Sequence, residues 1–493
     1  MKPVTGFSTY HVPLTTAPQT DSAPSPPVLQ DGHAGTVETT PARPPVSTKP
    51  TTSAPVRDPQ QAVAFCDAFN AGERLAPSGL DEKLALMCSS PLKLARCMPA
   101  LMMSDILGAF ADLAKLSDKP APVIWIDGDC HQGNFGIVQS RHGHAVWGLN
   151  DFDMACQGSP AMDLDRLAFS LVASMRERGL STADTTRVVD ALAKSYHKEV
   201  KEIADGQDHG EAYLNAKQSS GHIQKLIENA DAVTREDWIK KYAARGSDGS
   251  WHLVYSDKVE AVDPQTSNAV SDALHAYDHG QGVTPSVARP LQIMGVAQKL
   301  QSGGSSHGQP RYFALVENVD AKQPPILLEV KQELPAPLVR WNGDNAAAVT
   351  SSRANWTGNL HKADAAQVVR GQLSMGGDQN PLSGATSIDG ISYLVREREP
   401  CKATLSEKSF ATVEDYASFA DQAGQVLGLA HGRSAEQANA IVSWMGDKDS
   451  FAQRLDTFAQ AYANQAEADV EAFRAAHPIA SGSTGNGAPD SAD

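Results

Sequence analysis

A short central stretch, residues 121–171, constrains the fold of this 493-residue chain more than any other part of the sequence. An apolar run at 123–126 is typical of a buried strand, and several glycines follow it in a loop. Two more apolar runs, 135–138 and 145–149, predict a hairpin, and Pro160 predicts the first turn of an amphipathic helix. The stretch therefore predicts a strand, a loop, a hairpin and a helix, in that order.

Four polar side chains lie at the turns and ends of these segments: Asp129, Asn134, Asp151 and Asp163. Oxygen ligands of this kind suit a hard cation such as Mg²⁺. In phosphoryl transfer, one carboxylate accepts the proton of the attacking hydroxyl, while an Asn and a second carboxylate hold the metal on the nucleotide phosphates. The interval from Asp129 to Asn134 equals that between the Asp and the Asn of kinase catalytic loops. The pattern therefore predicts a phosphoryl-transfer site.

The same order of parts resembles the aminoglycoside and choline kinases, which have G-D-x-x-x-x-N, a hairpin, a metal-binding Asp and a further Asp that braces the loop. At a finer level, three blocks resemble the DUF2252 family of bacterial proteins. They are G-D-C-H-Q-G-N-F-G from Gly128, N-D-F-D from Asn150 and D-L-D-R-L-A from Asp163. The resemblance covers roughly residues 80–435 and implies a two-lobed, protein-kinase-like fold of the α/β (α+β) class.

The resemblance also implies a role for each side chain near the loop. Asp129 would be the catalytic base. Asn134 and Asp151 would be catalytic ligands of Mg²⁺, and Asp153 in the same N-D-F-D block would be a further metal ligand. These roles make ATP and Mg²⁺ the expected cofactors.

Other side chains are expected to support the loop or the phosphates. Asp163 would be a structural brace, together with Arg166, which is expected to pair with Asp163 or Asp165. His431 is a further candidate brace, although capping a helix C-terminus explains it equally well. Arg96 lies in a block that resembles the family's K-M-x-x-S-P-F-x-F-x-R-G. It is a candidate phosphate contact, and a salt bridge on a helix surface explains it equally well.

A second region resembles the part of a kinase that covers the nucleotide. Residues 311–316 and 326–331 predict two strands; Gly303 and Gly304 precede them, and Lys331 ends the second. Kinases cover and clamp the phosphates with a Gly-rich turn and a strand Lys, although the glycines are also explained by a plain flexible loop. Because these strands follow the catalytic loop, both assignments together imply a circularly permuted kinase fold, which surface termini permit.

One part of the kinase pattern is missing from the sequence. The helix predicted around 367–373 would normally supply a Glu to the strand Lys, but it contains none. Gln372, Glu329 and Glu333 are the candidate substitutes. Residues 393–397 predict the strand that leads into the hinge between the lobes.

Composition limits the partners and the compartment. The net charge of −16 argues against nucleic acid or an anionic membrane as the main partner. The six cysteines form no C-x-x-C pair, which favours reduced thiols in a bacterial cytoplasm. No apolar run approaches the ~18 residues of a membrane-spanning helix. A secreted effector is the alternative, because the chain starts with a Pro-rich segment similar to some effector leaders.

On this interpretation the chain has five parts. They are a disordered Pro/Thr/Ser-rich leader (1–57), a helical lobe with the catalytic loop (58–285), a strand-rich nucleotide-covering lobe (286–400), C-terminal helices (401–477) and a disordered tail (478–493).

The expected activity is ATP- and Mg²⁺-dependent transfer of a phosphoryl group to a hydroxyl of a small molecule or a protein. Two alternatives share the fold: a pseudokinase that binds a nucleotide or only a partner, and a nucleotidyl transferase that passes on AMP. A third alternative is a metallophosphoesterase, in which His131, His142 and His144 would be metal ligands.

Overall fold

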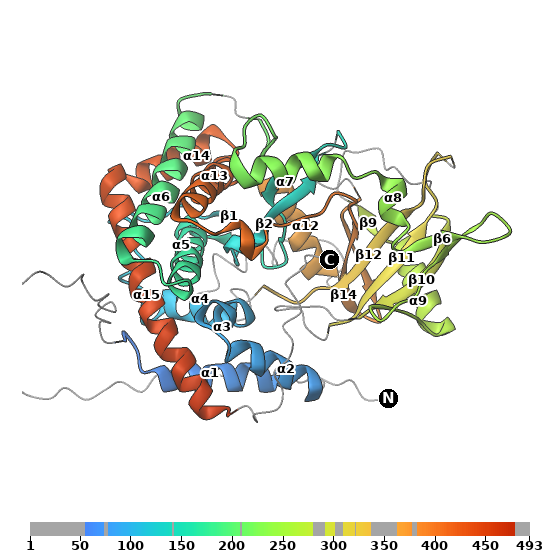
Figure 1. Ribbon diagram of the computed structural model, residues 1–493, viewed down its shortest axis with the longest axis horizontal. Helices are drawn as coiled ribbons and strands as arrows, with labels where there is room; N and C mark the ends of the chain where they lie inside the picture. The colour runs from blue at the N-terminus through green and yellow to red at the C-terminus, as the bar shows by residue number, and fades with distance from the viewer. Residues whose placement is uncertain are drawn as a thin grey trace, which may run out of the picture. The chain divides into compact units, whose positions relative to one another are not determined.

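A computed structural model describes most of the chain after residue 54. The described residues are 55–72, 77–140, 142–207, 210–279, 291–300, 309–320, 322–336, 362–376 and 382–478. Gly303 and Gly304, most of the expected leader and nearly all of the expected tail lie outside these ranges. Within the described ranges the chain is a mixed α+β protein (Figure 1), and no helix there has the length and hydropathy needed to cross a membrane.

Long helices form the largest hydrophobic core. Buried side chains such as Leu167, Tyr196 and Phe458 join α5, α6, α13 and α15, which pack against one another (Figure 1). These helices, with α14, are α5 (Pro160–Glu177), α6 (Thr182–Ala204), α13 (Val413–His431), α14 (Ala435–Met445) and α15 (Lys448–Ala476).

Shorter helices precede and follow this group. Several begin with proline, whose missing N–H costs nothing in the first turn of a helix. They are α1 (Pro59–Gly72), α2 (Pro77–Met87), α3 (Pro91–Cys97), α4 (Pro99–Leu107), α7 (Gly221–Asp231), α8 (Arg235–Ile239), α9 (Pro264–His275) and α12 (Ala363–Gly376).

The largest sheet among the described residues is antiparallel, with the strand order β8-β10-β11-β12-β14-β13-β9 (Figure 1). The strands are β8 (Val259–Ala261), β9 (Asp278–His279), β10 (Ile293–Lys299), β11 (Arg311–Val316), β12 (Ile326–Gln332), β13 (Gly384–Ile388) and β14 (Ile391–Glu397). Successive side chains of a strand point to opposite faces. Accordingly, Ala314 and Val316 pack with α9, whereas Phe313 and Leu315 pack with Trp238 of α8.

Smaller sheets form around the central stretch. β1 (Ile124–Ile126) pairs with β4 (Cys156–Gly158), and β2 (Phe135–Gln139) pairs with β3 (Ala145–Leu149). β5 (Tyr213–Leu214) joins β3, and β6 (Ala243–Arg245) pairs with β7 (Trp251–Leu253). The predicted order of strand, loop, hairpin and helix is confirmed, since α5 begins at Pro160.

The structure places two boundaries earlier in the chain than the sequence suggested. β8 and β9 join the large sheet, so the sheet takes strands from before residue 286. These strands and β5–β7 have only two or three residues each. Strands this short show almost no alternation of apolar and polar residues, so the sequence of this region predicted mainly helices. Arg57 is buried and forms ion pairs with Asp105 and Asp469, so it belongs to the folded part and not to the leader.

Candidate functional site

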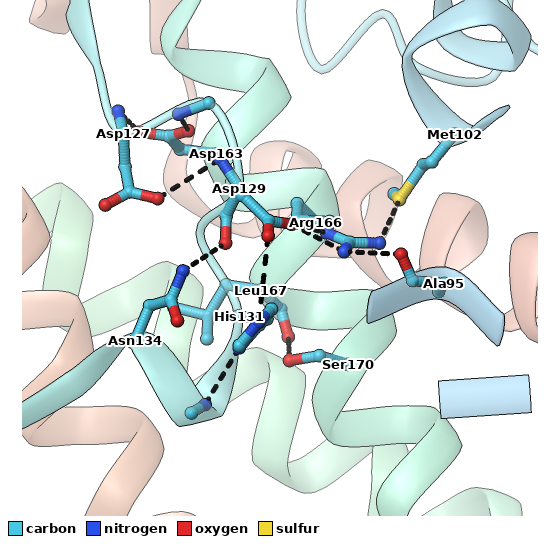
Figure 2. A network of polar contacts seen from close by, with 12 residues as sticks. Ala95, Met102, Asp127, Asp129, His131, Asn134, Asp163, Arg166, Leu167 and Ser170 are labelled. Atoms are coloured by element: carbon cyan, nitrogen blue, oxygen red, sulfur yellow. Dashed lines mark hydrogen bonds and ion pairs between the residues drawn. The ribbon is translucent and has the colours of Figure 1, made fainter. Parts of the chain in front are cut away.

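The loop between β1 and β2 is fastened to the first turn of α5 (Figure 2). The Asp163 carboxylate accepts hydrogen bonds from the backbone N–H of Asp127, at 2.7 Å, and of Gly128, at 2.9 Å. His431 Nε2, at the end of α13, lies 3.1 Å from Asp163 Oδ2, and the Tyr196 hydroxyl lies 3.1 Å from His431 Nδ1. Asp163 therefore holds the loop, and His431 supports Asp163.

Glycine is required at the start of the loop. Gly128 has a φ of +80°, a conformation that side chains with a Cβ disfavour. A Cβ at this position would also collide with the carbonyl oxygen of Met154. The Gly-Asp pair thus lets the loop turn tightly against the segment that follows β3.

Asp129 lies in this loop, buried beside Arg166 of α5. Arg166 donates from Nε and Nη2 to Oδ1 of Asp129, at 2.9 and 2.5 Å, and from Nη2 to the Ala95 carbonyl oxygen at 2.9 Å. The expected pairing of Arg166 with Asp163 or Asp165 is wrong. Asp163 points back to the loop, and neighbouring residues such as Asp165 and Arg166 do not face each other on a helix. Burial raises the pKa of Asp129 to about 6, although the Arg166 charge opposes this shift.

Asn134 closes the loop. Its side-chain Nδ2 donates to the Asp129 carbonyl oxygen, five residues earlier, at 3.0 Å. The amide oxygen is then the atom of Asn134 that suits a cation. The backbone N–H of Asn150 donates to the Asn134 carbonyl oxygen at 3.1 Å. Asn134, just before β2, and Asp151, just after β3, therefore lie at the same end of the hairpin.

The two carboxylates after β3 face the large sheet. Asp153 Oδ2 forms an ion pair with Nζ of Lys331, which lies on β12 and is 178 residues away in sequence. Asp151 Oδ1 and Asp153 Oδ1 are buried, and within the described ranges neither has a hydrogen-bonding partner. The predicted Lys331 and the predicted N-D-F-D block thus meet in the structure.

Glu333 is the acidic group nearest Lys331 among the three candidate substitutes for the missing helix Glu. Its Oε1 lies 3.5 Å from Lys331 Nζ, and burial raises its pKa to about 7 although Lys331 opposes the shift. Glu329 instead accepts from Arg311 at 3.2 Å and Arg396 at 2.8 Å. Burial alone would raise the pKa of Glu329, but these arginines hold it well below its ordinary value.

Asp127 is a site residue that sequence reasoning missed. It is fully buried, and its Oδ1 accepts from the backbone N–H of Asp129 at 3.1 Å. Burial, with the nearby charges of Asp163, Asp129 and Asp151, holds its pKa well above the ordinary value. The signal was the I-D-G-D string, in which a carboxylate directly precedes the glycine of the loop.

Arg96 lies beside the same loop. Its guanidinium is 3.5 Å from the position that a Cβ of Gly133 would occupy. Burial raises the pKa of Asp129 and the Arg96 charge opposes that rise, whereas burial lowers the pKa of His131 and the Arg96 charge adds to that shift. Cys130 is buried, and burial holds the pKa of its thiol well above the ordinary value. A neutral thiol is a poor nucleophile, so packing is the role that fits Cys130.

The loop and the N-D-F-D block offer ligands for a nucleotide-bound Mg²⁺. Among the described residues, no three His, Cys, Asp or Glu side chains gather into a metal site of their own. Mg²⁺ on a nucleotide needs only one or two carboxylates, because phosphates and waters complete its shell. The unpartnered oxygens of Asp151 and Asp153, with the amide oxygen of Asn134, fit that requirement.

Residues 75–476 match the family model described as "Uncharacterized protein conserved in bacteria (DUF2252)". The chain belongs to the DUF2252 family. No curated protein and no solved structure matches it. The matched range contains Asp129, Asn134, Asp151, Asp153 and Lys331, so the whole candidate site lies in the part of the chain shared with the family.

An open cavity adjoins the site in this DUF2252 protein. Its walls come from the end of β14 and the segment after it, from the β2–β3 hairpin and from Gln372 of α12. Asn150 and Phe152, on either side of Asp151, also line the cavity. The cavity therefore adjoins the end of the hairpin beside which the candidate metal ligands lie.

Proposed function

We propose that this DUF2252 protein is an ATP- and Mg²⁺-dependent phosphotransferase with a kinase-like fold, acting on a hydroxyl of a small molecule or a protein. The contact between Lys331 and Asp153 supports the proposal most strongly. It brings the strand Lys beside the block that contains Asp151. A backbone hydrogen bond ties that block to Asn134, whose side chain in turn donates to the Asp129 carbonyl oxygen.

Asp129 is suited to the role of base. Arg166 occupies Oδ1, which leaves Oδ2 to accept the proton of the attacking hydroxyl. With a pKa of about 6, the carboxylate is mostly ionised at neutral pH and remains basic enough to take a proton. The hydroxyl oxygen then bonds to the γ-phosphorus, the bond from that phosphorus to the β,γ-bridging oxygen breaks, and ADP leaves.

Lys331, Asp151, Asp153 and Asn134 are suited to holding the phosphates. Lys331 would turn from Asp153 to a phosphate oxygen, as the strand Lys does in kinases. Asp151, Asp153 and Asn134 would hold Mg²⁺, which neutralises charge on the phosphates when bound.

The order of elements is consistent with a permuted kinase fold. After the catalytic loop come two strands (β10 and β11), the Lys331 strand (β12), a helix (α12) and two more strands (β13 and β14). In kinases the Gly-rich strands, the Lys strand and the following helix occur in this order, but before the catalytic loop. The helix differs in one respect, because α12 contains no Glu, and Glu333 on the Lys segment lies 3.5 Å from Lys331 instead.

The described residues lend no support to a histidine-based metallophosphoesterase site. His131 lies just before η1 (Gln132–Asn134) at the start of β2, whereas His144 precedes β3. Because Gln139 at the end of β2 pairs with Ala145, these two histidines lie at opposite ends of the hairpin. AMP transfer and nucleotide binding without turnover use the same site and are separated by experiment.

A thermal-shift titration of the full chain tests the proposal. ATP and Mg²⁺, added separately and together, are compared for the wild type, Asp151→Asn and the exposed control Asp112→Asn. A ligand of the folded state stabilises it by RT ln(1 + [L]/Kd), about 2.7 kcal/mol at one hundred times Kd. The expected result is a shift that needs both components, disappears in Asp151→Asn and persists in Asp112→Asn.

Labelled ATP then identifies the reaction. Label in the γ-phosphate should reach the acceptor, and Asp129→Asn should keep the thermal shift while turnover falls by roughly 10²–10⁴-fold. Transfer of the α-phosphate label would mean AMP transfer. Full turnover in Asp129→Asn would show that another group is the base, and no shift with any combination would contradict the proposal.

A further inference from the structure

The cavity beside the candidate site has basic side chains on one wall. Arg396 lies near the end of β14, and Arg398 and Lys402 lie on the segment that follows it. The ligand class depends on which of these charges the protein already neutralises.

Two of the charged side chains in the wall have ion-pair partners. Arg396 donates from Nε to Glu329 Oε2 at 2.8 Å, and Glu397 forms an ion pair with Arg235. A third, Glu399, accepts a hydrogen bond from the backbone N–H of Gln139 at 2.8 Å. Arg396 and Glu397 therefore contribute little net charge to the cavity.

Arg398 and Lys402 differ from these residues. Arg398 is only 6% exposed, and within the described part of the chain neither its guanidinium nor the Lys402 ammonium has a hydrogen bond or an ion pair. A buried cation without a partner costs free energy. Both side chains line the cavity, and a ligand there is a partner that both can reach.

The electrostatic balance around Lys402 indicates the sign of that ligand. Burial lowers the pKa of Lys402 to about 7, and repulsion from Arg396 and Arg398 adds to the shift, although Asp151 opposes it. Glu399 is also buried, and burial raises its pKa to about 7. At neutral pH Glu399 and Lys402 are therefore both only partly charged, and Arg398 supplies the excess positive charge. The cavity thus has an excess of basic groups that a bound anion would relieve.

We propose that this cavity binds an oxyanion of the phosphate class, with Arg398 and Lys402 as its direct ligands. An Arg fork and a Lys ammonium are the side chains that proteins use for phosphate oxygens. Two sources would supply such a phosphate, the phosphate tail of a nucleotide and a phosphate group on the acceptor. Binding does not require the proposed transfer reaction, so the two proposals can fail separately.

Binding of tripolyphosphate to the full chain, measured by isothermal titration calorimetry without Mg²⁺, tests this site. Lys402→Met and Arg398→Met each remove one ligand, and neither breaks an ion pair among the described residues. Lys408→Met is the matched control, because it removes an exposed positive charge nearby. The net charge of −16 disfavours nonspecific anion binding elsewhere on the chain.

The wild type and Lys408→Met should bind tripolyphosphate alike, and each cavity variant should bind it at least about tenfold more weakly. No binding by the wild type, or equal binding by all four proteins, would overturn the proposal. If Arg398→Met does not fold, Lys402→Met alone decides the comparison.

Two further measurements distinguish the two sources of the phosphate and separate this proposal from the proposed transfer reaction. Displacement of tripolyphosphate by Mg²⁺-free ATP would assign the cavity to nucleotide phosphates, whereas binding without displacement would assign it to a phosphorylated acceptor. Asp151→Asn should keep tripolyphosphate binding while losing the shift with ATP and Mg²⁺. Tripolyphosphate binding without any response to ATP and Mg²⁺ would leave the anion site standing and remove the proposed transfer reaction.

Discussion

Asp165 is an isolated carboxyl group inside α5. It is fully buried, and in the part of the chain that the structure describes neither of its oxygens has a hydrogen-bonding partner. Burial is the cause that holds its pKa well above the ordinary value. A carboxyl group in this setting holds its proton to a higher pH than usual, because the charged form would be left without a partner.

Replacing Asp165 should change how stability depends on pH. The unfolded chain releases this proton above a pH of about 3.9 while the folded chain retains it. The stability of the wild type therefore falls as pH rises from there towards the folded pKa, by about 1.4 kcal/mol per pH unit for this group. Asp165→Asn has no such proton, so its stability relative to the wild type should increase as pH rises above about 4 towards the folded-state pKa of Asp165.

Chemical denaturation at several pH values measures this difference. Asp184→Asn is a control of opposite sign, because hydrogen bonds from Ser181 lower the pKa of Asp184. The wild-type advantage over Asp184→Asn should be present above a pH of about 4 and fade as pH falls below it. A constant difference between wild type and Asp165→Asn across the pH range would mean that Asp165 is ionised in the folded state.

At the scale of an element, the first two turns of α5 organise the candidate loop. Asp163 holds the backbone of Asp127 and Gly128, and Arg166, one turn later, holds the Asp129 side chain (Figure 2). Side chains three positions apart lie on one face of a helix, so a single helix face reaches both the backbone and the carboxylate of the loop.

Asp163→Asn should loosen this loop. The amide offers one oxygen in place of two and turns an NH₂ group towards one of the backbone N–H groups. Hydrogen bonds to a charged group are each worth about 1.5–3 kcal/mol, so a loss of roughly 3 kcal/mol in unfolding free energy is expected. Hydrogen exchange at the amides of Asp127 and Gly128 should speed up. Unchanged exchange there would show that other contacts hold the loop.

At the scale of the whole molecule, Arg57 joins parts of the chain that are far apart in sequence. It donates to Asp105 of α4 at 2.6 and 2.8 Å and to Asp469 of α15 at 2.9 and 2.7 Å. Its backbone N–H also donates to Gln465 Oε1 at 3.0 Å. All of these groups are buried, so loss of Arg57 would leave two buried carboxylates without their cation.

Truncation around Arg57 should therefore show a sharp threshold. A chain that starts at residue 53 should unfold like the full chain, whereas one that starts at residue 59 should lose about 3–5 kcal/mol, the cost of breaking a buried ion pair. Arg57→Met in the full chain separates the ion pairs from the removal of backbone. Equal stability of both truncated chains would show that the Arg57 contacts contribute nothing.

Much of the site was predictable because it depends on neighbours in sequence. The period of apolar residues predicted β1, the β2–β3 hairpin and α5, since backbone periodicity follows from nearby side chains. The Asp129–Asn134 interval likewise marked both residues as members of one candidate loop. The structure joins them directly, because five residues suffice to bring the Asn134 amide back to the Asp129 carbonyl oxygen. These features required no knowledge of the rest of the chain.

The partners of the buried charges depend instead on which distant segments pack together. Arg166 binds Asp129, Glu333 lies beside Lys331, and Arg57 reaches α4 and α15. No local pattern selects among several nearby carboxylates, because burial decides which charges must pair and the packed backbone decides which ones meet. The same reason applies to Arg398 and Lys402 in the cavity wall. Only the packed structure shows that these two side chains lack an ion-pair partner among the described residues, because that requires the positions of all their neighbours.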